Sequence, residues 1–125
     1  MTMRRTMGVL ALAACVAGLS APARAEGTCR DPICTRNTAQ YKGDKRWDWT
    51  VFIDPRSRDL TRIKCVEYTL HRTFPNPVRI VCEMGSVDRP FALSSNGWGT
   101  FEIKLRVLMK DGSFRDASHQ LSFRR

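Results

Sequence analysis

The sequence contains little of what an active site is usually built from. Histidine occurs only as His71 and His119, which lie far from the cysteines in the chain. The acidic residues fall mostly in turns and at alternating positions of strand-like segments, where carboxylates usually serve solubility. Catalysis needs a nucleophile beside a base, a pair of placed carboxylates or a metal cluster. We therefore expect a protein that is not an enzyme and that holds no metal or other cofactor.

Long apolar segments are also lacking. Residues 7–19 form the main apolar run, and this run is shorter than the roughly 20 residues that a membrane-spanning helix needs. Two arginines precede it, and Ala-Arg-Ala at residues 23–25 has the small-x-small pattern of a signal-peptide cleavage site. We expect residues 1–25 to be a signal peptide. The remaining chain would be exported, periplasmic or secreted, without stable insertion in a membrane.

A second processing route stays open for the same segment. Residues 12–15, Leu-Ala-Ala-Cys, resemble the cleavage site of a bacterial lipoprotein. Cleavage there would leave Cys15 at the new N-terminus with a lipid attached, although the apolar run before it would be unusually short. A lipid anchor at Cys15 is therefore the alternative to cleavage after residue 25.

No clustered basic face can be found in the sequence. Loss of residues 1–25 takes away three arginines and no acid, which lowers the formal net charge from +9 to +6. The remaining charges are scattered through strand-like segments and turns, as on a solvated surface with a mild preference for anionic partners. Nucleic-acid binding usually needs clustered basic residues beside stacking aromatics. We expect no nucleic-acid partner.

Four cysteines remain once Cys15 is removed, and an even number in an exported domain favours disulfides. Cys29 and Cys34 lie close together in a polar segment, which predicts a local bridge. Cys65 and Cys82 lie on two strand-like segments that they could join. Zinc competes as an explanation, but the spacing lacks the paired, closely spaced ligands of a structural zinc site.

Helical periodicity is absent from residues 26–125, whereas alternation of apolar and polar residues is frequent. Residues 26–45 are polar and show no hydrophobic period, so we expect a cysteine-containing N-terminal arm. Asp111-Gly112 is typical of a hairpin turn. Beyond the arm, alternation predicts strands near residues 47–53, 63–70, 78–84, 91–93, 101–109 and 119–123. This pattern predicts an all-β domain over residues 46–125, an immunoglobulin-like antiparallel β-sandwich.

One segment between two predicted strands is unlike an ordinary loop. His71, Thr73 and Phe74 directly precede Pro75-Asn76-Pro77. The two prolines restrict the backbone and remove hydrogen-bond donors, so the residues before them are presented in a limited set of conformations. Taken alone, a histidine or a phenylalanine here is more often structural than functional.

A second unusual segment precedes the strand expected at residues 101–109. Trp98 lies between Gly97 and Gly99, three positions before the strand residue Phe101. Glycines let a backbone approach a ligand closely. A single tryptophan at a strand end is more often a core residue, but the two segments together form a pattern that packing alone does not require. They predict a binding site.

Four segments carry a resemblance to a known family. WTVFID, VEYTLHRTFPNPVRIV, RPFAL and GWGTFEIKLRVLMKDG occur in the order, and at about the spacing, of the YEATS domain, and closely resemble its prokaryotic branch. The resemblance covers about residues 47–123. YEATS domains are immunoglobulin-fold readers of acylated lysine, with an aromatic channel between two loops. The resemblance implies a binding module for a flat acylamide, whose partner is an acylated protein or peptide, or an N-acylated component of the envelope.

The same resemblance implies roles for both loops. His71 would border the channel and orient it, and the hydroxyl of Thr73 would bond the acyl amide. Phe74 and Trp98 would sandwich the flat amide and the acyl group between them. The channel would select acylated over unmodified lysine, because an unmodified lysine would have to bring a solvated ammonium between the same two rings.

Further residues of the channel are implied less directly. The backbone around Trp98 and Gly99 would donate to the acyl carbonyl, and Phe101 would support the pocket. In some members an additional aromatic comes from the segment before the first strand, for which Tyr41 and Trp47 are the candidates here.

Two other functions stay open. A structural or adaptor immunoglobulin-like domain of the envelope would use the Trp98 loop for packing only. A lectin-like module would bind N-acetylated glycans, whose acetamido group is chemically close to acetyl-lysine. Solvent exposure of Trp98 separates the adaptor from both binding functions, and a panel of ligands separates the remaining two.

Overall fold

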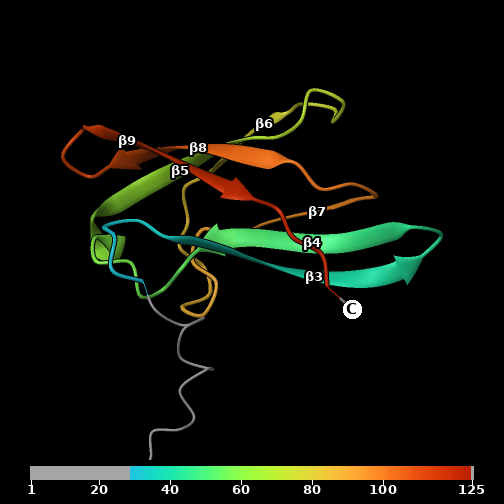
Figure 1. The fold of residues 1–125 in the computed structure, drawn as a ribbon. Helices are drawn as coiled ribbons and strands as arrows, with labels where there is room; N and C mark the ends of the chain where they lie inside the picture. The colour runs from blue at the N-terminus through green and yellow to red at the C-terminus, as the bar shows by residue number, and fades with distance from the viewer. Residues whose placement is uncertain (1–28, 125) are drawn as a thin grey trace, which may run out of the picture.

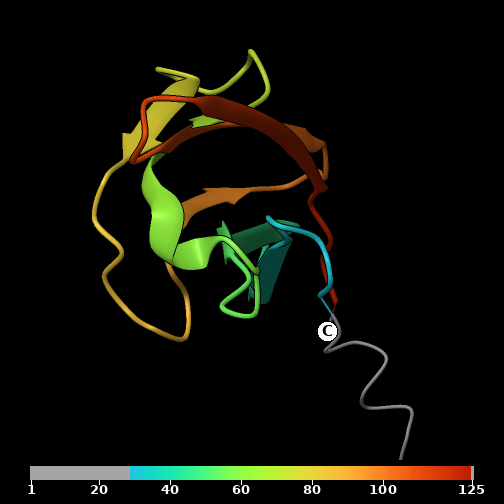
Figure 2. The same ribbon diagram turned by 90° about the vertical axis from the view of Figure 1, so that its left-hand side faces the viewer.

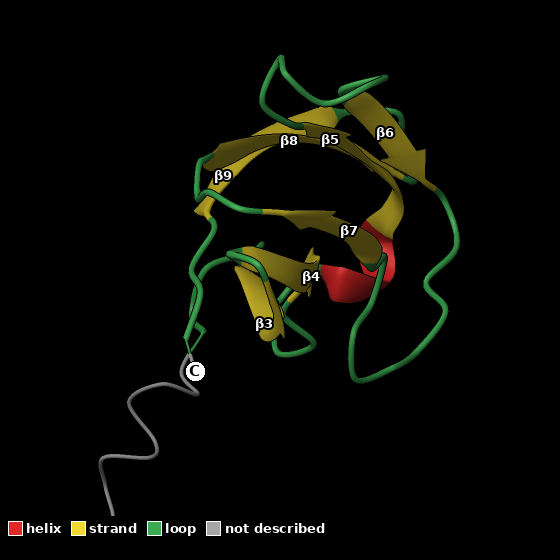
Figure 3. Cartoon of the chain, turned by 90° about the vertical axis from the view of Figure 1, so that its right-hand side faces the viewer, coloured by secondary structure: helices red, strands yellow, loops and turns green. Residues whose placement is uncertain are grey.

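Alternating side chains build two antiparallel sheets in the computed structural model, which describes residues 29–124. The elements are β3 (Thr35–Gly43), β4 (Arg46–Ile53), the 3-10 helix η2 (Leu60–Arg62), β5 (Ile63–Thr69), β6 (Val78–Val81), β7 (Leu93–Gly97), β8 (Glu102–Met109) and β9 (Phe114–Gln120). One sheet has the order β3-β4-β7 and the other β6-β5-β8-β9. Figures 1 and 3 show the two sheets as separate layers. The predicted immunoglobulin-like antiparallel β-sandwich is confirmed.

The expected signal peptide, residues 1–25, lies outside the described residues, and so does the alternative lipid attachment at Cys15. Both stay predictions. Between residues 29 and 124, no helix has the length and apolar character needed to cross a membrane.

The core lies between the two sheets, and β8 shows why the chain folds this way. Ile103, Leu105 and Val107 are buried, while the charged residues between them are exposed. This is the period of two that the sequence predicts for a strand with one buried face. Burial of these side chains contributes about 1.5–3 kcal/mol each to the free energy of unfolding. Asp111-Gly112 forms the predicted turn into β9, with Gly112 at a φ of 91°.

Residues 35–43 correct the expectation of an arm without strand structure. They form β3, which pairs antiparallel with β4 from Thr35 opposite Ile53 to Gly43 opposite Arg46. Side chains of β3 alternate between half-buried and exposed, but the half-buried ones are mostly small or polar, so no hydrophobic period marks the strand. The sandwich therefore begins at residue 35 and not at residue 46.

The strand expected at residues 78–84 is shorter in the structure, and two of its apolar side chains are exposed. Val78 is 48% exposed and Ile80 is 65% exposed, so the apolar alternation in this segment does not mark a buried face. Pairing with β5 decides the orientation, because Val66 lies opposite Val81 and opposed residues point to the same side of a sheet. Val66 is fully buried, and Val81 packs against the core. The side chains of Val78 and Ile80 therefore face solvent.

Two edge strands also lie elsewhere than predicted. The strand expected at residues 91–93 is β7, which starts at Leu93, and the final strand is β9 and not residues 119–123. Both strands are composed mainly of polar residues. The prediction followed the alternation of apolar residues, which falls on the segments next to these strands. Phe91 is buried outside any strand at a φ of 53°, and its carbonyl accepts a hydrogen bond of 2.6 Å from the Tyr68 hydroxyl. Burial raises the pKa of Tyr68.

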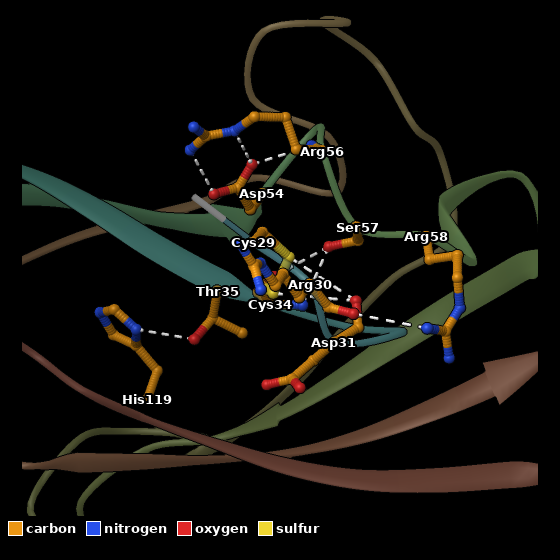
Figure 4. The surroundings of a disulfide bond; sticks show 10 residues. All are labelled: Cys29, Arg30, Asp31, Cys34, Thr35, Asp54, Arg56, Ser57, Arg58 and His119. Atoms are coloured by element: carbon orange, nitrogen blue, oxygen red, sulfur yellow. Dashed lines mark hydrogen bonds and ion pairs between the residues drawn. A yellow bond between two sulfur atoms is a disulfide. The ribbon is translucent and has the colours of Figure 1, made fainter. Parts of the chain in front are cut away.

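Two disulfides join the cysteine pairs expected from the sequence. Cys65 and Cys82 link β5 to the segment after β6, with their Cα atoms 4.0 Å apart. Cys29 and Cys34 close a short loop ahead of β3 (Figure 4). The Cys34 backbone N–H donates to Ser57 Oγ at 2.9 Å, so this loop is tied to the turn that follows β4. Formation of both bonds during export stays a prediction.

The turn after β4 holds a buried carboxylate. Asp54 is 3% exposed and accepts two hydrogen bonds from the Arg56 guanidinium, at 3.0 and 2.7 Å (Figure 4). Burial acts to raise the pKa of Asp54, but the hydrogen bonds and charge of Arg56 outweigh it and hold that pKa below its usual value. In Figure 2, η2 lies beside this turn at the end that faces the viewer, and Figure 1 shows the β3–β4 hairpin at the opposite end.

Candidate ligand-binding site

Two loops meet at one end of the sandwich and enclose a cavity of about 380 Å³. The first, residues 70–77, joins β5 to β6, and the second, residues 98–101, joins β7 to β8 (Figure 1). The cavity is lined by Arg46, His71, Thr73, Phe74, Pro75, Asn96, Gly97, Trp98, Gly99, Thr100 and Phe101. All the binding residues expected from the two loops therefore line one cavity, although their parts in binding stay predictions.

The first loop is held by bonds between its own residues. Nδ1 of His71 lies 2.9 Å from Thr73 Oγ1 and accepts the Thr73 backbone N–H at 3.3 Å. Since Nδ1 is an acceptor, the Thr73 hydroxyl donates to it and keeps its oxygen lone pairs for another group. The Phe74 N–H donates to the His71 carbonyl at 3.0 Å, and the Leu70 N–H donates to the Pro77 carbonyl at 2.8 Å. The Thr73 oxygen is thus positioned to accept an amide N–H.

Aromatic rings form the inner wall of the cavity. The rings of Phe74 and Phe101 are 5.2 Å apart at 51°, and each meets the buried Trp49 edge to face, at 6.2 and 6.0 Å. A Cβ atom added to Gly97 would lie 3.7 Å from the Phe74 ring, which therefore rests against the glycine backbone. The wall is fixed by packing on Trp49, because that side chain is only 1% exposed.

Trp98 differs from the other rings of the cavity. Its side chain is 74% exposed, and within residues 29–124 it makes no ring contact with another aromatic. Next to it, a Cβ atom added to Gly99 would meet nothing within 4 Å, so the fold itself does not require a glycine there. Trp98 is therefore not a core residue. The cavity has one packed aromatic wall and one exposed indole.

Among the lining residues that the sequence prediction missed, Arg46 and Asn96 lie on strands. The Nε atom of Arg46, on β4, donates to Asn96 Oδ1, on β7, at 2.7 Å. The Asn96 amide nitrogen donates in turn to Asp48 Oδ1 at 2.6 Å. These side chains meet because Asp48 is paired with Asn96 in the sheet. Charged and polar residues at alternating positions were visible in the sequence, but the register that joins them was not.

Tyr41 and Trp47, the candidates for an additional aromatic, do not line the cavity. The Trp47 ring stacks on Phe123 with centroids 4.9 Å apart and a 14° interplanar angle, and Tyr41 meets Trp47 edge to face at 5.2 Å. Trp47 follows Arg46 on β4, and successive side chains of a strand point to opposite faces. Trp47 therefore lies on the other face of the strand and stacks on Phe123, while Arg46 reaches the cavity.

The second histidine has a structural position. His119, on β9, lies 2.9 Å from Thr35 Oγ1 through Nδ1 (Figure 4) and 2.7 Å from Asn37 Oδ1 through Nε2. Burial lowers the pKa of His119. No cluster of three or more His, Cys, Asp or Glu side chains that could hold a metal ion occurs in the described part of the chain.

Comparison with known proteins relates the chain to one group. The model of the prokaryotic YEATS domain family matches residues 47–122. The AF-9 homologue of Kluyveromyces lactis is 39% identical over 93 residues, which cover 66% of this chain and 40% of that protein. The homologue of Eremothecium gossypii is 40% identical over 91 residues, which cover 64% of this chain and 41% of that protein. The chain thus spans well under half the length of these relatives.

Solved structures give the same relationship. The Yaf9 YEATS domain recognising an H3K122suc peptide has a TM-score of 0.57 and 28% sequence identity, over 77% of this chain and 80% of that chain. The Yaf9 YEATS domain bound to H3K27ac has a TM-score of 0.57 and 27% identity, over 78% of this chain and 80% of that chain.

Proposed function

This chain belongs to the prokaryotic YEATS domain family, and from that premise we propose that it is a non-catalytic module that binds an acylated lysine side chain in the cavity between its two loops. One observation carries the proposal: Trp98 is 74% exposed and lines the same cavity as the packed Phe74. A domain that used the Trp98 loop for packing only would bury this indole. The two Yaf9 structures named for acylated histone peptides support the same class of ligand.

The chemistry of an acylamide suits this cavity. The group is flat and neutral, and each aromatic face that stacks on it contributes about 0.5–1.5 kcal/mol beyond burial. Its N–H can donate to Thr73 Oγ1, which keeps free lone pairs while its hydroxyl bonds His71. An unmodified lysine would lose the hydration of its ammonium and find no carboxylate among the residues that line the cavity. Binding should therefore depend on acylation.

We place the partner outside the cytoplasm, as an acylated protein or peptide. The sequence of residues 1–25 predicts export, and the paired cysteines suit an oxidising compartment. The family's histone ligands would then be absent. The module would read another acylated chain.

A titration followed by tryptophan fluorescence or NMR tests this function. Peptides with acetyl-lysine or crotonyl-lysine should bind with Kd between about 1 μM and 1 mM, whereas the unmodified peptide should not bind. Trimethyl-lysine is the decisive control, because an aromatic cage built for cations would prefer it. Tighter binding of trimethyl-lysine, or of N-acetylglucosamine, than of either acyl-lysine would refute the proposal.

A further inference from the structure

Given the function proposed above, we propose that Arg46 makes the cavity prefer acyl chains that end in a carboxylate, such as succinyl-lysine, over neutral acyl chains of the same length. Among the described residues that line the cavity, Arg46 is the only arginine or lysine, and no aspartate or glutamate lines it.

The guanidinium is oriented and available. Asn96 accepts from Arg46 Nε at 2.7 Å, and the Asn96 amide is itself fixed by donating to Asp48 at 2.6 Å. Within residues 29–124, this arrangement uses Nε and leaves both terminal nitrogens of Arg46 available to a ligand. The ion pairs found within residues 29–124 involve other arginines, Arg56 and Arg115. A planar guanidinium with two parallel N–H groups matches a carboxylate in bidentate geometry.

The position of Arg46 relative to the loops suits an acyl chain with two functional ends. Its neighbour Trp47 is paired with Gly97, so Arg46 lies on the strand beside the Trp98 loop. Thr73, the acceptor for the amide N–H, comes from the other loop. A dicarboxylic acyl chain offers its amide to Thr73 and its terminal carboxylate to Arg46. Asp48 reduces this preference without cancelling it, because its carboxylate is bonded to Asn96 and does not line the cavity.

The carboxylate could also come from an acidic side chain next to the acyl-lysine in the peptide. Both sources present the same chemistry to Arg46, so the test must separate them. Three peptides do so: a neutral peptide with succinyl-lysine, the same peptide with the terminal carboxylate replaced by a carboxamide, and a peptide with acetyl-lysine beside one glutamate.

The wild-type chain should bind succinyl-lysine about threefold or more tightly than its carboxamide, in the range of a partly exposed ion pair. Arg46→Gln should bring the two affinities together, because the variant loses the charge that would pair with the terminal carboxylate. Arg36→Gln is the matched control, because it removes the same charge from the same sheet. Arg36 is paired with Phe52, six positions along β4 from Arg46 and about 20 Å away at the rise of a strand. This control should keep the preference.

NMR spectra of both variants establish that they are folded. Equal binding of succinyl-lysine and its carboxamide by the wild-type chain overturns the inference, and so does a preference that survives Arg46→Gln. A third result is that Arg46 increases affinity only for the peptide with acetyl-lysine beside a glutamate. That result would show that Arg46 binds a carboxylate of the peptide and not of the acyl chain, and it also overturns the inference. Acetyl-lysine binding without a succinyl preference leaves the proposed function standing, whereas failure of every acyl peptide to bind refutes both.

Discussion

The two histidines of the chain lie in opposite settings. His71 is exposed in a loop of the cavity and bonds Thr73, two positions away. His119 is half-buried on β9 and bonds Thr35 and Asn37 of β3, which are 84 and 82 positions away. The first cavity loop, residues 70–77, is thus held by bonds between its own residues, whereas the β3–β9 seam around His119 joins the two sheets. Changes in the loops should alter binding, and changes in the seam should alter stability.

The largest expected effect is on binding alone. Trp98→Ala should weaken acetyl-lysine binding by about tenfold or more, because one stacking face and its burial are lost. The free energy of unfolding should change by less than about 0.5 kcal/mol, since the side chain is 74% exposed. Titration and chemical denaturation measure the two quantities. Unchanged binding would exclude Trp98 from the site.

A substitution of Phe74 should affect both binding and stability, because this side chain contributes to the cavity and to the packing behind it. Its ring lines the cavity and also packs on Trp49 and Phe101. Phe74→Ala should lower the free energy of unfolding by about 2 kcal/mol, less than for a fully buried phenylalanine, and should also weaken binding. Phe74→Leu is the control that restores packing without the flat face. Its stability should recover while its affinity for acetyl-lysine stays low.

The contrast between local and distant contacts also explains what the sequence could predict. The alternation of β8 predicted its buried face, and the spacing of His71, Thr73 and Phe74 placed them in one loop, because neighbours in the chain decide both. The bond from Arg46 to Asn96 spans 50 positions and depends on the pairing of β4 with β7. Pairing of this kind has no local signature, which is why the charged residue of the cavity was missed.

β3 was missed for a related reason. Its half-buried side chains include Thr35, Asn37 and Ala39, so hydrophobicity gives no period of two. Its place in the sandwich comes from backbone pairing with β4 and from the bonds that Thr35 and Asn37 make with His119. The polar residues Thr35 and Asn37, which remove the hydrophobic period from the sequence, are thus the residues whose hydrogen bonds hold β3 in the sandwich.

A smaller effect is expected for Thr73. Thr73→Val keeps the shape of the side chain and removes the hydroxyl that bonds His71 and is positioned for an amide N–H. Affinity for acetyl-lysine should fall about fivefold, which corresponds to one hydrogen bond of about 1 kcal/mol. Thr73→Ser keeps the hydroxyl and should bind within about twofold of the wild-type chain. Equal affinities of the valine and serine variants would show that the hydroxyl does not contact the ligand.

The smallest expected effect concerns the pH dependence of the seam. Burial lowers the pKa of His119 in the folded chain below its unfolded value, so below about pH 6.5 the unfolded chain binds more protons than the folded one. The free energy of unfolding should therefore be constant above about pH 7.5 and should fall as the pH is lowered from there to about 5.5. Protonation would put a charge on Nδ1, which now accepts from the Thr35 hydroxyl. His119→Gln should remove this slope. Denaturation at pH 7.5 and 5.5 measures the difference. A slope that survives His119→Gln would place the titrating group elsewhere in the chain.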